Sequence, residues 1–197
     1  ELVALVGPSG SGKSSLLHLL ALLDDPSSGK IIVNQQETKN FSNLQKDEVR
    51  RDKISIIFQD NNLLSDFTAI ENIYLASLAA GDSKDFAIKK YKNLLREVGL
   101  TGRSNHYPSQ LSGGEKARVA VARALMNNPR IIFADEPTGN LDPYLSRQVI
   151  ALFHQFKDLG TTVLVASHDI DLIKDQGCRI LHLSQGSLVQ DTDGTKS

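Results

Sequence analysis

The eight residues Gly-Pro-Ser-Gly-Ser-Gly-Lys-Ser at positions 7–14 limit the possible folds of this chain more than any other stretch. They follow an apolar run at residues 2–6 and precede a leucine-rich segment at residues 15–23, which predicts a strand, a glycine-rich loop and a helix. In such a loop, backbone N–H groups and the helix N-terminus together hold phosphate groups. Lys13 adds a positive charge, and the Ser14 hydroxyl is suited to bind Mg²⁺. The stretch therefore predicts a nucleotide-binding P-loop.

Length, charge and cysteine content restrict the remaining possibilities. At 197 residues the chain has room for one sizeable α/β core with an inserted subdomain. Its net charge of −1 argues against a nucleic-acid partner, and the single cysteine, Cys178, excludes an internal disulfide framework. No apolar run approaches the roughly eighteen residues of a membrane span, so we expect no direct membrane insertion. The first residue, Glu1, already lies in a strand pattern, and we expect a fragment without its true N-terminus.

Three further apolar runs are typical of buried parallel strands. Each is followed by polar residues whose side chains can take part in chemistry. The runs at residues 54–58, 131–134 and 162–167 are followed by Gln59, by Asp135 and Glu136, and by His168. Ligands of open α/β sheets bind at the carboxyl ends of the strands. Two adjacent carboxylates there point in different directions, so one can bind Mg²⁺ through water while the other faces an attacking water. We expect all four side chains to meet beside the P-loop.

A helical region interrupts this strand pattern. Thr68 and Glu71 form a capping-box pattern that predicts a helix start, and Gly81 predicts its end. A second helix is predicted over residues 85–98 from apolar residues at three- and four-residue steps. We predict one domain over residues 1–197, with a core at residues 1–64 and 125–197 and a helical subdomain at residues 65–124.

A second serine-glycine stretch, Leu-Ser-Gly-Gly-Glu at residues 111–115, precedes a helix predicted over residues 116–126. Like the P-loop, it places small residues at a helix N-terminus, where free N–H groups can bind an anion. Ser112 and Glu115 also match an ordinary capping box, so both interpretations stay open at this point.

The order of these motifs resembles the nucleotide-binding domain of an ABC transporter, and the resemblance extends over essentially the whole chain. It implies an α/β P-loop NTPase fold, with a mainly parallel sheet flanked by helices and an inserted helical subdomain. The family's N-terminal β-region, which carries the aromatic residue that stacks on adenine, is largely missing here. The resemblance also implies ATP and Mg²⁺ as cofactors.

The resemblance further assigns roles to residues. Nucleotide contacts fall on Gly7, Pro8, Ser9, Gly10, Ser11, Gly12, Lys13, Ser14, Ser15 and Gln59. The implied Mg²⁺ ligands are Ser14, Gln59 and Asp135, and the implied catalytic residues are Lys13, His168 and the general base Glu136. Residues that act in trans on ATP held by a second copy are Ser112, Gly113, Gly114 and Asp142. Each site is then complete only in a head-to-tail dimer.

Within the family, residues 61–72 and 135–142 look like the bacterial group that includes LolD, FtsE and the MacB exporters. Residues 15–23 and 105–123 are similar to the LolD type, which implies an ATPase that drives lipoprotein release or export through integral membrane permease subunits. Residues 161–171 are similar to FtsE, which implies a nucleotide-gated regulator of a cell-division partner. Either protein is peripheral on the cytoplasmic face of the bacterial inner membrane. A small-molecule kinase shares the P-loop but does not need residues 112–114.

Overall fold

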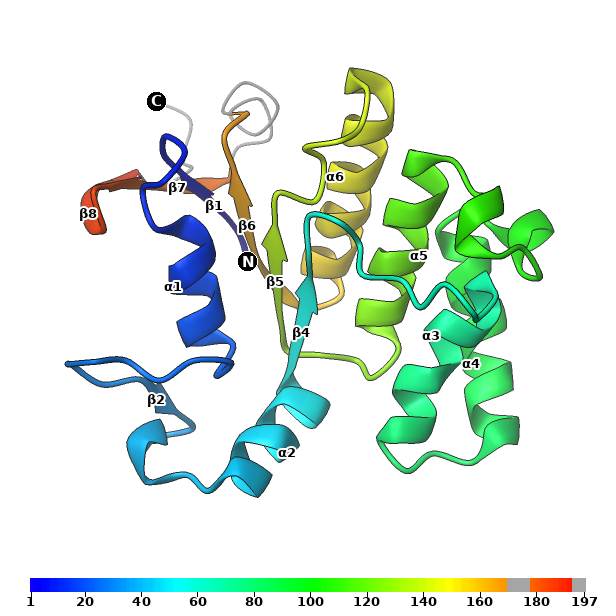
Figure 1. Cartoon of the computed structure of the whole chain (residues 1–197), viewed down its shortest axis with the longest axis horizontal. Coiled ribbons are helices and arrows are strands. Elements are labelled where there is room, and N and C mark those ends of the chain that lie inside the picture. The colour runs from blue at the N-terminus through cyan, green and yellow to red at the C-terminus, as the bar shows by residue number, and fades with distance from the viewer. Residues whose placement is uncertain (170–177, 193–197) are drawn as a thin grey trace.

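The structure, a computed structural model, describes residues 1–169 and 178–192. Within these residues, six strands form the main sheet in the order β4-β5-β6-β1-β7-β8 (Figure 1). Their bounds are β4 (Ile54–Ile57), β5 (Ile131–Asp135), β6 (Thr162–Ser167), β1 (Leu2–Val6), β7 (Arg179–Ser184) and β8 (Ser187–Thr192). The first five run parallel, and β8 forms an antiparallel hairpin with β7. This confirms the predicted mainly parallel sheet.

Strand β1 lies inside the sheet and is buried along its whole length. Because successive side chains point to opposite faces, Ala4 and Val6 join one apolar cluster while Leu5 joins the other. Helix α1 (Lys13–Leu20) covers the face of Leu5, and α5 (Gly113–Leu125) and α6 (Pro143–Asp158) cover the opposite face (Figure 1). An apolar residue at every position of β1 is the consequence of cover on both faces.

Helix α1 begins at Lys13, two residues earlier than the sequence predicts, and it ends at Leu20. Gly12, with φ of +96°, turns the chain directly into the helix. Leu22 has φ of +58°, which breaks the helical path before the predicted end at Leu23. The P-loop and the helix therefore share residues rather than follow one another.

The polar region at residues 34–53, between β2 and β4, contains elements that the sequence pattern leaves unassigned. A two-stranded hairpin of β2 (Ile32–Val33) and β3 (Gln36–Glu37) leads into η1 (Thr38–Asn40) and α2 (Asn43–Lys53). Helix α2 buries none of its residues, so it has no apolar stripe by which to recognise it. Its sequence signal is the capping box at its start, where Ser42 Oγ accepts from Gln45 N and Gln45 Oε1 accepts from Ser42 N.

Helices α3 (Ala69–Ala79), α4 (Lys84–Glu97) and α5 form a group beside the sheet, connected by η2 (Thr101–Arg103) and η3 (Pro108–Gln110). The predicted capping box is confirmed, because Glu71 Oε2 accepts from Thr68 N at 2.8 Å. Helix α5 packs against α3 and α4 on one side and against α6 and β4 on the other. It therefore joins the helical region to the sheet. The predicted subdomain boundary stays a prediction.

The helices of the described residues are too short or too polar to cross a membrane.

Candidate functional site

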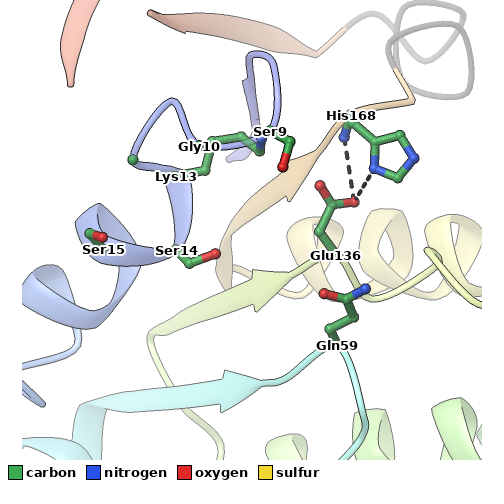
Figure 2. A pocket seen from close by; sticks show the side chains of 9 residues that line it. Ser9, Gly10, Lys13, Ser14, Ser15, Gln59, Glu136 and His168 are labelled. Carbon is green, nitrogen blue, oxygen red and sulfur yellow. Dashed lines mark hydrogen bonds and ion pairs between the residues drawn. The ribbon is translucent and has the colours of Figure 1, made fainter. Parts of the chain in front are cut away.

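A pocket of 610 Å³ opens at the carboxyl ends of the parallel strands. It is lined by Ser9, Gly10, Gly12, Lys13, Ser14, Ser15, Gln59, Glu136 and His168. Figure 2 shows the side chains of Gln59 and Glu136 across this space from the P-loop, with His168 beside the Glu136 carboxylate. The sheet order explains why these side chains lie beside the P-loop, since β4, β5, β6 and β1 are consecutive neighbours and end at one edge. The pocket is within the size range of ligand sites.

The P-loop wraps around its own lysine. Lys13 Nζ donates to Gly7 O at 2.8 Å and to Pro8 O at 3.2 Å, and only 7% of the residue is exposed. The loop also closes on itself, because Ser11 N donates to Pro8 O at 3.1 Å. A buried ammonium needs such acceptors, and they hold the positive charge of Lys13 on the pocket wall.

Gly7 lies where another part of the chain comes very close, a feature that the sequence did not reveal. A Cβ on Gly7 would lie 2.2 Å from Leu183 O of β7. The turn after β7 also contacts the loop, since Gly186 N donates to Ser11 O at 3.0 Å. The β7–β8 hairpin therefore supports the P-loop from behind, and Gly7 is needed for this close approach.

Replacing Gly7 by alanine is expected to displace the P-loop from β7 and to weaken ATP binding roughly 10-fold or more. This corresponds to the cost of about 1–3 kcal/mol for forcing extra atoms into a packed region. Isothermal titration calorimetry with ATP measures the loss. Gly102→Ala is the matched control, because a Cβ there meets no atom within 4 Å. Equal affinities of Gly7→Ala and wild type would contradict the supporting role of the hairpin.

Glu136 follows β5 in a left-handed backbone conformation, with φ of +47°. Such a conformation is uncommon for a residue with a side chain and often marks functional sites. Its backbone N–H donates to Ala166 O at 2.9 Å, and its Oε2 accepts from the backbone N of His168 at 3.4 Å and lies 2.8 Å from His168 Nδ1 (Figure 2). The Glu136 side chain is 14% exposed and that of His168 65%. The carboxylate thus lies deep in the pocket and the imidazole at its rim.

The neighbouring carboxylate, Asp135, is not among the residues that line the pocket. Its Oδ1 is buried and has no hydrogen-bond partner among the described residues. Such an orphaned oxygen is costly unless a cation or donor reaches it. Ser14 and Gln59 supply a hydroxyl and an amide oxygen in the adjoining pocket, and Mg²⁺ prefers oxygen ligands of these kinds. The described residues contain no cluster of three or more acidic, histidine or cysteine side chains that could hold a metal alone. The kinds of oxygen that Ser14, Gln59 and Asp135 carry therefore suit Mg²⁺.

The second serine-glycine stretch lies outside this pocket. Ser112 caps α5, with its Oγ accepting from Glu115 N at 3.3 Å and its N–H donating to Glu115 Oε2 at 2.8 Å. The hydrogen bond from Ser112 N lowers the pKa of the Glu115 carboxyl. The capping box is therefore confirmed, and α5 starts at Gly113 rather than at Lys116 as predicted. Ser112 and Gly113 are both exposed.

Gly114 and Asp142 take part in local packing and capping. A Cβ on Gly114 would lie 2.7 Å from Leu145 Cδ1, so this glycine allows α5 to approach α6. Asp142 Oδ1 accepts from Tyr144 N at 2.9 Å and from Leu145 N at 3.0 Å, which caps α6. Neither residue lines the pocket of its own chain.

A P-loop on β1, acidic residues at the end of β5 and a parallel sheet between helices define a P-loop nucleotide-binding protein. Residues 1–139 match the family model described as ABC transporter. The chain therefore belongs to the ABC transporter family, as its ATP-binding domain.

Two curated relatives place the chain within this family. It is 42% identical over 188 residues to an uncharacterized ABC transporter ATP-binding protein of Thermotoga maritima, covering 95% of this chain and 80% of the relative. It is 44% identical over 191 residues to the macrolide export ATP-binding/permease protein MacB of Bdellovibrio bacteriovorus, covering 97% of this chain. The chain spans only 29% of the length of that MacB protein.

Two solved structures of MJ0796, a bacterial ABC transporter cassette, share the fold. The dimeric post-hydrolysis state bound to ADP and Pi has a TM-score of 0.90 and 36% identity, covering 100% of this chain and 87% of that chain. A second dimeric structure has a TM-score of 0.91 and 37% identity with the same coverage. The predicted fold class is confirmed, and the chain is an ABC ATPase domain that binds and hydrolyses ATP.

Proposed function

We propose that this chain is the ATPase subunit of a membrane ABC complex, in which ATP lies between the P-loop of one copy and residues 112–114 of another. One observation carries the proposal: Ser112 and Gly113 are exposed at the N-terminus of a 13-residue helix yet lie outside the pocket of their own chain. A helix N-terminus favours an anion, and a second copy supplies one as the terminal phosphate of its ATP. The dimeric structures of the relative MJ0796 support this arrangement.

The residues of the pocket divide the chemistry among them. Lys13 and the P-loop N–H groups bind the phosphates. Ser14, Gln59 and Asp135 would hold Mg²⁺, which when bound would neutralise part of the phosphate charge. Glu136 accepts a hydrogen bond from the attacking water and orients it in line with the terminal phosphate. His168 keeps the Glu136 carboxylate in place and contributes a donor toward that phosphate. Asp142 lies at the start of α6 and faces the partner copy.

The membrane partner is an integral permease, and we place its docking surface around Gln59 and the helical region. Cycles of ATP binding and hydrolysis close and open the dimer and so move the permease. The 44% identity to MacB over 191 residues supports a place in this export group, on the cytoplasmic face of the bacterial inner membrane. Within it we propose lipoprotein release or export of the LolD type. The FtsE-type alternative rests on residues 161–171, of which 170 and 171 lie outside the described residues.

A nucleotide-trapped dimer tests the composite site. Glu136→Gln with saturating ATP is expected to double the molar mass measured by light scattering, because ATP still binds while hydrolysis no longer releases the dimer. Without ATP the same variant is expected to be a monomer. A variant that stays monomeric with ATP, although calorimetry shows that it binds ATP, would contradict the proposal.

Co-expression distinguishes the two pathways. The LolD-type proposal expects the chain to co-purify with a lipoprotein-release permease, and expects added lipoprotein to stimulate ATP hydrolysis by the complex. Co-purification with a division permease alone, without stimulation by lipoprotein, would favour the FtsE-type role.

A further inference from the structure

A side chain of α5 holds the backbone just beyond Gln59. Arg123 Nη2 donates to Asn61 O at 2.7 Å, and Arg123 Nη1 donates to Asn62 O at 2.6 Å. Arg123 does not line the nucleotide pocket. It lies near the end of the helix whose first turn carries the Ser112–Glu115 capping box. One helix therefore carries both the exposed serine-glycine stretch and an anchor for the segment after Gln59.

The anchored turn has an unusual backbone. Asn61 and Asn62 are consecutive residues in the left-handed region, with φ of +60° and +43°. Asparagine tolerates this conformation better than most residues, but each such residue still carries a conformational cost. Asn61 N donates to Phe58 O at 2.9 Å, which closes the turn around Gln59. Two hydrogen bonds from one guanidinium to successive carbonyls fit this turn and stabilise it.

The guanidinium is specialised for this contact. Arg123 is half-buried, and burial lowers the pKa of its guanidinium. Among the described residues its polar partners are these two backbone carbonyls, and no carboxylate pairs with it. The planar fork of arginine can donate to both oxygens at once from separate nitrogens, whereas lysine offers a single charged nitrogen. The contact therefore depends on arginine specifically, and not only on positive charge.

Gln59 is fixed to α5 from both sides. Before it, Ser55 Oγ of β4 donates to Ala124 O, the residue next to Arg123, at 2.6 Å. After it, Arg123 holds Asn61 and Asn62. Further along, the buried Asn72 of α3 holds the same segment, accepting from Leu64 N at 2.8 Å and donating to Phe67 O at 2.9 Å. Gln59 thus protrudes into the pocket from a backbone that β5 holds before it, through the pairing of β4 up to Ile57, and that the helical region holds after it.

We propose that Arg123 is a positioning residue for Gln59, which ties the Gln59 amide in the nucleotide pocket to the helix that presents Ser112 and Gly113. The consequence is that α5 and Gln59 move together, so displacement of α5 changes the Mg²⁺ side of the pocket. This rests on the proposed function of Gln59 as an Mg²⁺ ligand.

Arg123→Lys in the full chain tests the proposal, with Arg96→Lys on the exposed surface of α4 as the control. Hydrogen–deuterium exchange of the peptide covering residues 58–66 is expected to rise several-fold in Arg123→Lys and to stay unchanged in Arg96→Lys. The kcat for ATP hydrolysis, corrected for folded fraction, is expected to fall about 10-fold, because small displacements of positioning groups slow reactions by up to about 100-fold. The Kd for ATP measured without Mg²⁺ is expected to stay within about 2-fold, since the P-loop is untouched.

Unchanged exchange in Arg123→Lys would overturn the proposal, as would raised exchange with unchanged kcat, which would show a structural role alone. The double variant Gln59→Ala/Arg123→Lys separates this inference from the function on which it rests. If Arg123 acts through Gln59, kcat of the double variant falls no further than kcat of Gln59→Ala. A fall in kcat equal to the product of the fold losses of the two single variants would overturn the inference. A wild-type kcat in Gln59→Ala contradicts the proposed role of Gln59 instead, while the exchange measurement still decides whether Arg123 anchors the segment.

Discussion

Glu136→Gln is expected to lower kcat for ATP hydrolysis at least about 100-fold while leaving the Kd for ATP nearly unchanged. General-base catalysis contributes about 100-fold to 10,000-fold, and an amide cannot accept the proton of the attacking water. Glutamine has the same shape, and its Oε1 can still accept from His168, so the 2.8 Å contact and the backbone around it are preserved. Steady-state release of phosphate measures the rate, and calorimetry measures binding.

Glu97→Gln is the matched control, because Glu97 is exposed on α4 and lies far along the chain from the pocket residues. It removes the same charge and is expected to hydrolyse ATP at the wild-type rate. If Glu136→Gln hydrolyses ATP as fast as this control, Glu136 is not the general base, and the neighbouring Asp135 becomes the candidate.

Lys13→Ala is expected to weaken ATP binding about 10-fold to 100-fold. Lys13 Nζ is held at the pocket wall by two loop carbonyls, where it meets phosphate oxygens without a large rearrangement. Hydrogen bonds to charged groups contribute about 1.5–3 kcal/mol, which corresponds to this range of affinity. Calorimetric titration with ATP measures the effect.

The control for this change is Lys92→Ala, an exposed lysine of α4. It lowers the net charge equally and is expected to leave the Kd for ATP within about 2-fold, because surface charges distant from the site are screened by salt. An equal loss of affinity in both variants would show a general electrostatic effect and would contradict a specific role for Lys13.

The parts of the fold that local patterns specify were predictable from sequence. The uninterrupted apolar run of β1 predicts cover on both faces, and the capping box at Thr68 predicts the start of α3. The polar residues after β4, β5 and β6 were expected to meet, because parallel strands present their carboxyl ends at one edge. Gln59, Glu136 and His168 line one pocket in the structure, whereas Asp135, the last residue of β5, is not among the lining residues.

Contacts between distant segments were not predictable in the same way. The approach of Leu183 O to Gly7 and the bonds from Arg123 to the turn after Gln59 depend on backbone carbonyls, which leave no residue-specific signal. Helix α2 was missed because it packs no buried residue and so has no periodic apolar pattern. The left-handed conformation of Glu136 is likewise imposed by its surroundings, since a glutamate does not favour it intrinsically.

The central claim is that each ATP site is built from two copies of the chain, and mixing two inactive variants tests it most directly. Lys13→Ala disables the P-loop, and Gly113→Asp places a negative charge that repels the phosphates of ATP. An acidic residue in the first turn suits the helix, and a Cβ at Gly113 makes only ordinary contacts, the nearest at 3.6 Å, so this variant is expected to fold. Each variant alone is expected to be nearly inactive.

In an equal mixture, half of the dimers contain one chain of each kind, and one of their two sites combines an intact P-loop with an intact Gly113. Measured ATP hydrolysis of the mixture is therefore expected to recover to roughly a quarter of the wild-type rate if the two sites act independently. A mixture no more active than the average of the two variants would contradict a site shared between copies.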